Sequence, residues 1–233
     1  MNKLRVDVWS DIACPWCYVG KRRLEAALRV FSHRDEVEVV WHAFELDRAA
    51  PTERDSSQSY AERLSKKYGT TVERAQGMIQ RMTDVAKKDD LDFHFEKVRS
   101  GNTFDAHRVI HMAGLRGVQD KVKERMLRAY MTEGEPIGDR GALGRLAGEA
   151  GLDAGEVDDM LAGDLYADSV RADEAKAAEL GISGVPFFVI GGKYAISGAQ
   201  PTEVFVKGLE QAWAELAGDP AFEEGAMCGP EGC

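Results

Sequence analysis

The order of hydrophobic periodicities along the chain is the feature that most restricts its fold. Residues 4–9 and 36–44 have the apolar, β-branched character of strands, and residues 15–31 between them have helical period. From about residue 52 to 180 nearly every segment has helical period, and strand character returns only in VPFFVIGGKYAISG at residues 185–198. Neither strand-containing end could bury a sheet alone, so we predict that the two ends close into one domain.

The two ends together predict a thioredoxin-like α/β fold. The first end is a strand–helix–strand unit, in which the two strands should be parallel. The second is a two-residue hairpin around Gly191-Gly192, followed by an amphipathic helix over residues 201–217. We therefore predict a thioredoxin fold with a large all-helical insertion. The predicted thioredoxin-like domain consists of residues 1–50 and 181–217. Residues 51–180 form the helical insertion domain between them, and residues 218–233 form a loosely held tail.

Helix boundaries inside the insertion follow from capping patterns. Thr70 with Glu73 predicts a capping box, and Asp153 with Glu156 predicts a second N-cap. Asn102 or Thr103 is the expected N-cap of a helix beginning near Phe104.

Composition excludes several classes of function. The 233 residues carry a formal net charge of −10, which argues against nucleic acid as the main partner. No apolar run approaches the roughly 20 residues of a membrane-spanning helix. The first residues, MNKLRVDVWSDIA, have no long apolar stretch and pass directly into a strand, so we expect no signal peptide, no membrane partner and a cytoplasmic protein.

The four cysteines form two closely spaced pairs, Cys14 with Cys17 and Cys228 with Cys233. A structural disulfide framework would distribute its cysteines along the chain, and a reducing cytosol would not preserve it. Close pairs in a cytoplasmic protein indicate redox chemistry or metal binding.

The first pair has the arrangement that a reactive dithiol needs. Cys14 stands where a helix begins, and the unpaired N–H groups of a helix N-terminus favour a thiolate. We predict that Cys14 is the exposed attacking thiol and that Cys17, one turn later, is the more buried resolving thiol. Pro15 and Trp16 lie between them and should tune the reduction potential. A zinc cage built from all four cysteines is the alternative, but zinc clips usually use turns rather than helix starts.

The second pair lies in the glycine-rich stretch MCGPEGC. Its spacing lets the two sulfurs meet, so we favour an auxiliary redox pair over metal binding or incidental thiols. His107 and His111 are four residues apart on one helical face, a spacing that can bind metal. We favour structural packing for both histidines, with substrate contacts second, and we predict no metal site.

Three features together resemble the DsbA-like thioredoxin-fold oxidoreductases, closest to the FrnE-type cytoplasmic subgroup. These are CPWC after the first strand, GVPFFVIGGKYAISGAQ near the end, and the helical insertion between them. The resemblance implies that Cys14 attacks, Cys17 resolves, and Val185-Pro186 forms a cis-proline loop facing the dithiol. Val185 would then pair with an extended substrate strand.

The stretch NTFDAHR is also similar to glutathione-dependent chromene-carboxylate isomerases and kappa-class glutathione transferases of the same superfamily. Those enzymes typically carry serine where this chain has Cys14, so both cysteines favour redox chemistry. Glutathione remains a candidate electron donor or acceptor.

We therefore predict a cytoplasmic thiol–disulfide oxidoreductase or isomerase that acts on protein disulfides, with oxidative stress as the expected setting and no bound cofactor. The alternatives are a glutathione-dependent isomerase or transferase using Cys14, and a metal-binding or chaperone-like protein without enzymatic activity. The sequence carries no signal for an oligomeric state.

Overall fold

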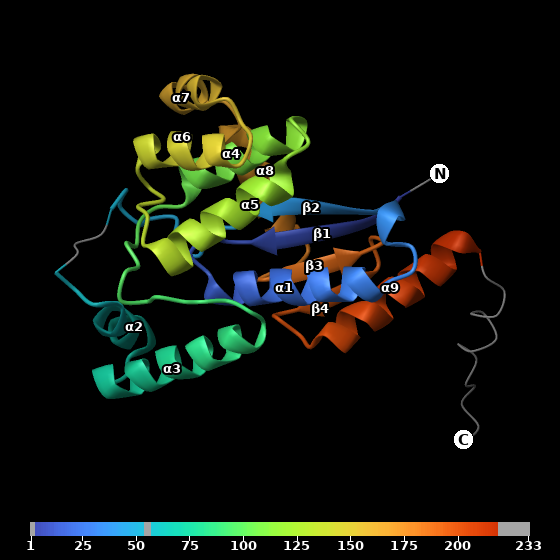
Figure 1. Cartoon of the computed structure of the whole chain (residues 1–233), viewed down its shortest axis with the longest axis horizontal. Helices are drawn as coiled ribbons and strands as arrows, with labels where there is room; N and C mark the ends of the chain where they lie inside the picture. The colour runs from blue at the N-terminus through green and yellow to red at the C-terminus, as the bar shows by residue number, and fades with distance from the viewer. Residues whose placement is uncertain (1–2, 54–56, 219–233) are drawn as a thin grey trace.

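A four-stranded mixed sheet lies at the centre of the computed structural model, which describes residues 3–53 and 57–218 (Figure 1). Its strands run in the order β2-β1-β3-β4, with bounds Leu4–Ser10 for β1, Val37–Ala43 for β2, Phe187–Ile190 for β3 and Tyr194–Ser197 for β4. β1 is parallel to β2 and antiparallel to β3, and β3 is antiparallel to β4. Strands from both ends of the sequence thus share one sheet, which confirms the predicted thioredoxin fold.

Helices α1 (Pro15–Val30) and α9 (Thr202–Ala217) pack together on one face of this sheet (Figure 1). Val6 and Val8 of β1 are fully buried. They are two residues apart, so their side chains point to the same face of the sheet. Phe188 of β3 meets Phe205 of α9 edge to face, with ring centroids 4.7 Å apart. The short η1 (Arg34–Glu36) connects α1 to β2.

The helices between β2 and β3 form what we call the helical segment. Their bounds are Tyr60–Tyr68 for α2, Val72–Lys88 for α3, Phe104–Leu115 for α4, Gln119–Arg128 for α5, Ala129–Glu133 for η2, Arg140–Glu149 for α6, Ala154–Ala162 for α7 and Ala167–Glu179 for α8. Helices α4, α5 and α8 pack against the edge strand β2, whereas α2 and α3 form a separate pair near α1 (Figure 1). The segment therefore contacts the sheet at β2 and helix α1 through different helices.

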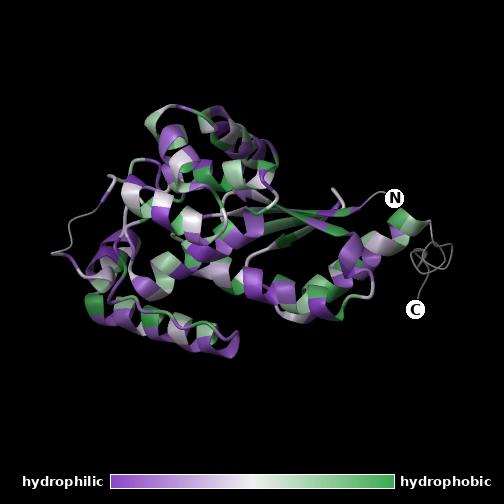
Figure 2. Cartoon of the chain, turned by 45° about the horizontal axis from the view of Figure 1, so that its top comes forward, coloured by the Kyte–Doolittle hydropathy of each residue, from purple (hydrophilic) through white to green (hydrophobic). Residues whose placement is uncertain are grey.

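Hydrophobic and hydrophilic residues are mixed along each helix, as expected of amphipathic helices that turn one face inward (Figure 2). Most buried apolar residues of α1, α4, α5, α6 and the sheet belong to one continuous core, and Trp9 of β1 packs in a smaller cluster with Ala177 and Ile182. In the two described stretches, no helix combines the length and apolar character needed to cross a membrane.

Two local predictions are wrong. The N-cap of α3 is Thr71, whose side chain accepts a hydrogen bond from Arg74 N, so Thr70 and Glu73 do not form a capping box. The capping box of this region is one helix earlier, at Ser59 and Glu62 of α2. The β3–β4 hairpin has three residues, not two, between its last paired residues Ile190 and Tyr194. Gly191 and Gly192 still supply the positive φ values of the turn, 59° and 71°.

Other caps agree with the sequence. Asp153 accepts a hydrogen bond from Glu156 N at 2.9 Å at the start of α7. Thr103 is the N-cap residue of α4, while the side chain of the preceding Asn102 accepts the hydrogen bond from Phe104 N at 2.8 Å.

Candidate active site

The Cys14–Cys17 pair begins helix α1. Cys14 is the N-cap residue, with an extended backbone (φ −98°, ψ 109°), and Pro15 follows as the first helical residue. The Cys17 backbone N–H donates to the Cys14 carbonyl oxygen at 3.0 Å, which brings the second cysteine into the first turn. Both side chains therefore lie at the positive end of the α1 dipole.

The loop before β3 lies against this pair. The Val185-Pro186 peptide bond is cis, as the resemblance implies. Cys14 Sγ is 3.5 Å from the Val185 carbonyl oxygen, within reach of an S–H···O hydrogen bond. A Cβ atom on Gly20 of α1 would lie 3.0 Å from Pro186 Cγ, so the glycine lets the helix approach the loop. The predicted juxtaposition of Val185-Pro186 and the dithiol is confirmed.

The predicted exposure of the Cys14 sulfur is wrong. Cys14 is only 4% exposed and Cys17 1% exposed, whereas Trp16 between them is 39% exposed. The Val185 carbonyl covers one side of the Cys14 sulfur. Sequence periodicity does not show that this loop, about 170 residues away in the chain, packs against the start of α1.

The environment of Cys17 keeps its thiol protonated. Burial raises the pKa of Cys17 well above its usual range, and the neighbouring Cys14 raises it further. Lys123 of α5 acts in the opposite direction. A buried thiol with a raised pKa fits the role of the resolving cysteine.

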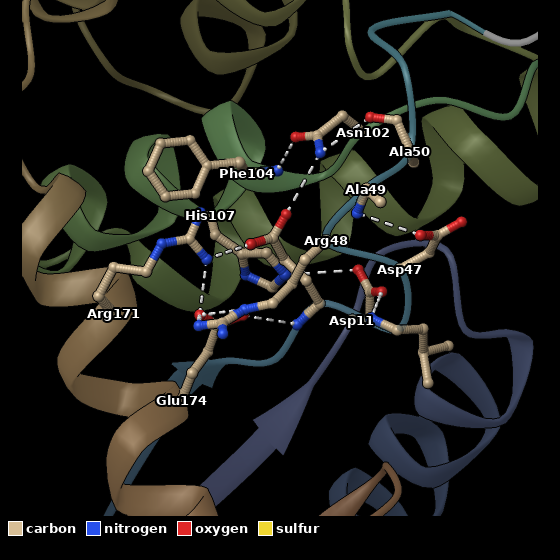
Figure 3. Close-up of polar contacts among 12 residues, drawn as sticks. Asp11, Asp47, Arg48, Ala49, Ala50, Asn102, Phe104, His107, Arg171 and Glu174 are labelled. Carbon is tan, nitrogen blue, oxygen red and sulfur yellow. Dashed lines mark hydrogen bonds and ion pairs between the residues drawn. The ribbon is translucent and has the colours of Figure 1, made fainter.

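Asp11 connects three elements beside the dithiol. It follows β1 and is 1% exposed. Its carboxylate accepts a hydrogen bond from Leu46 N at 2.8 Å and lies 3.4 Å from both Ala13 N and His107 Nε2, and Figure 3 shows it facing His107. Burial opposes ionisation of Asp11, but the interactions with His107 and the Leu46 backbone hold the pKa of the carboxyl below its usual range. The carboxylate thus fixes the loop that precedes Cys14.

His107 and His111 contact different carboxylates, although they lie on one face of α4. His107 is 1% exposed, and burial holds the pKa of its imidazole below the usual range. His111 Nε2 is 2.8 Å from Asp173 Oδ2 of α8. These contacts agree with the structural interpretation. Among the described residues, no group of three or more histidines, cysteines and acidic residues could hold a metal ion.

A second polar cluster lies on the other side of His107. Asn102, just before α4, and Arg171 of α8 contact the buried carboxylate of Glu45. Arg171 and Arg48, from the loop after β2, both pair with Glu174 of α8, and Figure 3 shows these three side chains together. A cavity of about 530 Å³ borders Asn102, but neither Cys14 nor Cys17 lines it. Its arginines Arg108 and Arg140 already contact the Asp105 carboxylate. We interpret the polar cluster around Glu45 as a structural support for the loop after β2.

Sequence reasoning missed Lys123 and Asp11. Lys123 is 0% exposed although it lies in the strongly polar stretch QDKVKERMLR of α5. Its position gives no signal, because a lysine in such a helix is usually on the solvent face. The predicted pair Cys228–Cys233 lies outside the described residues, and its redox role stays a prediction.

Comparisons with known proteins agree with this fold. Residues 5–210 match the model of the DSBA-like thioredoxin domain. The uncharacterized protein YwbO of Bacillus subtilis is 30% identical over 219 residues, which cover 88% of this chain and 96% of YwbO.

Among solved structures, a probable DsbA oxidoreductase of Streptomyces coelicolor, SCO1869, is 45% identical, with a TM-score of 0.85 over 91% of each chain. The cytosolic disulfide reductase DsbM of Pseudomonas aeruginosa is 17% identical, with a TM-score of 0.57 over 92% of this chain and 98% of DsbM, and shares the fold. With its cysteines at the start of α1 and its family match over nearly the whole length, this chain belongs to the DSBA-like thioredoxin domain family.

Proposed function

We propose that the protein is a thiol–disulfide oxidoreductase or isomerase of protein disulfides, with Cys14 attacking and Cys17 resolving. The observation that carries this proposal is the contact between Cys14 Sγ and the Val185 carbonyl at the start of α1, with Cys17 buried behind it. The family and the 45% identity to a probable DsbA oxidoreductase support the same chemistry.

In the reductive direction the Cys14 thiolate attacks one sulfur of a substrate disulfide. A bond forms between Cys14 Sγ and that sulfur, and the other substrate sulfur leaves as a thiolate. The Cys17 thiolate then attacks Cys14 Sγ, which releases the second substrate thiolate and leaves a Cys14–Cys17 disulfide. The oxidative direction is the reverse of these two steps.

The surroundings of the dithiol fit a polypeptide substrate. An extended substrate segment would pair with the backbone of Val185 beside Pro186. Trp16 is 39% exposed, and Leu46, whose N–H is held by Asp11 on the other side of the loop, is 38% exposed. These two side chains would offer apolar contact to an unfolded chain, and Pro15, the other predicted contact residue, is buried at the start of α1.

The wider setting is also a proposal. We expect a cytoplasmic enzyme of the FrnE type without a bound cofactor, for which the cytosolic reductase DsbM offers a precedent within the fold. Glutathione would be the small-molecule electron donor or acceptor. Cys228 and Cys233 would form an auxiliary dithiol that exchanges with Cys14–Cys17, since a tethered pair acts at an effective concentration of up to about millimolar.

Trapping of mixed disulfides tests the assignment of the two cysteines. Cys17→Ser should accumulate a mixed disulfide with a protein substrate that contains disulfides, because no second thiol resolves the intermediate. Cys14→Ser should not accumulate one. Insulin reduction driven by dithiothreitol should be lost in both variants. Equal trapping by both variants would contradict the roles, and glutathione-dependent isomerisation without insulin reduction would favour the other enzyme class.

A further inference from the structure

Leu46, in the loop after β2, is an exposed leucine on a firmly held backbone. Its side chain is 38% exposed, but its backbone N–H donates to the buried carboxylate of Asp11 at 2.8 Å. The N–H of the preceding Glu45 donates to the carboxylate of Glu174 on α8 at 3.3 Å, and Arg171 holds the Glu45 side chain. Two successive amides of a surface loop are thus bonded to carboxylates from other elements, which fixes the direction of the Leu46 side chain.

Asp11 also shapes the backbone that carries Cys14. The Asp11 carbonyl oxygen accepts a hydrogen bond from Cys14 N at 3.3 Å, and the Asp11 carboxylate lies 3.4 Å from Ala13 N. Its side chain is 1% exposed and lies 3.4 Å from His107 Nε2 of α4. One buried residue therefore contacts both Leu46 N and Cys14 N, which places Leu46 beside the attacking cysteine.

The base of the same loop meets the cis-proline loop. Phe44 and Val185 are half-buried, and both pack against the small cluster that contains Trp9. Val185 carries the carbonyl oxygen that lies 3.5 Å from Cys14 Sγ. The loop after β2 is therefore a third wall of the dithiol site, beside the start of α1 and the cis-proline loop.

We infer that Leu46 selects polypeptide disulfides with an apolar side chain close to the half-cystine that Cys14 attacks, and that Asp11 positions Leu46 for this contact. An extended polypeptide rises about 3.4 Å per residue, so side chains one to three positions from the half-cystine lie within roughly 10 Å of it along the chain. Packing such a side chain on Leu46 removes apolar surface from water. Because the loop is fixed before binding, little conformational entropy is lost in the contact.

This inference rests on the proposed function and adds a specificity to it. A small disulfide has no neighbouring side chain that reaches Leu46, so only polypeptide disulfides gain from the contact. A single exposed leucine would not carry this conclusion, since scattered apolar residues are normal on protein surfaces. Here the conclusion follows from the two carboxylates, of Asp11 and Glu174, that fix the backbone, and from the contact of Asp11 with Cys14 N.

Two peptides of equal length test the selection. Each carries one cysteine as a mixed disulfide with thionitrobenzoate, and they differ only in having leucine or serine on both sides of that cysteine. The Cys14 thiolate attacks the peptide sulfur, a bond forms between Cys14 Sγ and that sulfur, and thionitrobenzoate leaves as a coloured thiolate. The Cys17 thiolate then attacks Cys14 Sγ, and the peptide leaves as a thiolate. The parent is the reduced full chain carrying Cys228→Ser and Cys233→Ser, so that only two thiols react.

The parent should react with the leucine peptide roughly tenfold faster than with the serine peptide, the lower end for one apolar contact. Both rates are divided by the rates with dithiothreitol, which corrects for the intrinsic reactivity of the two disulfides. Leu46→Ser should bring the two rates within about twofold of each other, whereas Leu46→Met should keep the ratio because methionine has a similar apolar volume. Neither variant should change the rate with dithionitrobenzoate, a small disulfide.

Leu216→Ser is the matched control. Leu216 is 45% exposed but lies in the last turn of α9, at the end of the molecule away from the start of α1 (Figure 1). This variant should keep the ratio of the parent. A ratio that falls equally in Leu46→Ser and Leu216→Ser overturns the inference, because the loss would not depend on the position of the leucine.

Asp11→Ala tests the positioning of Leu46. It removes the acceptor of Leu46 N and should lower the ratio as Leu46→Ser does. The double variant should lower it no further, because both substitutions act through one contact. Amide hydrogen exchange of the parent gives a measurement that does not require Asp11→Ala to fold: Leu46 N–H should be protected, although it lies in a surface loop.

The inference is overturned if Leu46→Ser or Asp11→Ala keeps the ratio of the parent, or if the Leu46 amide exchanges as fast as an unprotected amide. A parent with no preference between the peptides also overturns it, and the proposed function stands if that parent reduces insulin. A parent that prefers the leucine peptide but does not reduce insulin refutes the proposed function and leaves the role of Leu46 standing.

Discussion

His42 of β2 should make the free energy of unfolding depend on pH above the range in which histidines normally titrate. Its Nδ1 is 2.6 Å from Asp173 Oδ1 of α8, and its Nε2 is 2.7 Å from Asp7 Oδ1 of β1. The ring also stacks on Trp9 at 4.5 Å. The imidazolium thus joins a helix of the helical segment to two neighbouring strands.

The two carboxylates outweigh the effect of burial on this imidazole. Burial opposes its charge, but Asp173 and Asp7 raise the pKa of His42 from 6.5 to about 9. One pKa unit corresponds to about 1.4 kcal/mol, so the protonated ring contributes about 3 kcal/mol to folding. The same ion pair lowers the pKa of Asp173, so the two shifts describe one interaction and are not added.

The sign of the effect follows from the raised pKa. Below the unfolded pKa of 6.5 both states bind the proton, and the full contribution of about 3 kcal/mol is present. As pH rises toward 9 the folded protein loses this advantage, with about 1.4 kcal/mol left at about pH 8 and almost none at about pH 10. Stability should therefore fall through this window.

Urea unfolding of the wild type and His42→Gln across this pH range provides the assay, and the difference between their unfolding free energies isolates His42 from other titrating groups. His33→Gln is a matched control, because His33 also stacks on an indole, that of Trp213 at 4.3 Å, but is 42% exposed. A difference between wild type and His42→Gln that is constant from about pH 6 to about pH 10, or grows with pH, would refute the reasoning.

Four further substitutions test the packing of the site, the residues that support it and the capping of a neighbouring helix. Gly20→Ala should lower the unfolding free energy by about 1 kcal/mol and slow insulin reduction, because the new methyl displaces Pro186. Gly77→Ala is its control: the new Cβ meets nothing closer than 3.6 Å, so the unfolding free energy should rise by about 0.5–1 kcal/mol in the same denaturation assay. Asp11→Asn should lower the unfolding free energy by about 1–3 kcal/mol, since an amide turns a donor toward donors, and an unchanged urea midpoint would contradict this. Ser59→Ala should cost about 1 kcal/mol of cap stability, visible as faster amide exchange confined to the first turn of α2.

Local sequence patterns were enough to predict most helices and strands and the reactive cysteine pair. Strand alternation at residues 4–9 and 36–44, the helix that begins at Pro15, and the glycine pair at Gly191 predicted the thioredoxin-like ends. These signals are local, because backbone period and turn chemistry depend on neighbours within a few residues. Cys14 and Cys17 were found for the same reason, as was Val185-Pro186 once the family resemblance was noted.

The surroundings of that pair depend on contacts between elements that are distant in the sequence. The covering of Cys14, the burial of Lys123 and the position of His42 between Asp7 and Asp173 all join residues far apart in the sequence. The local sequence does not show whether a lysine in a polar helix or a histidine in a strand is exposed or buried. Their charge states depend on desolvation and on the distances to other charges, and both are set by packing between elements rather than by the pattern within one.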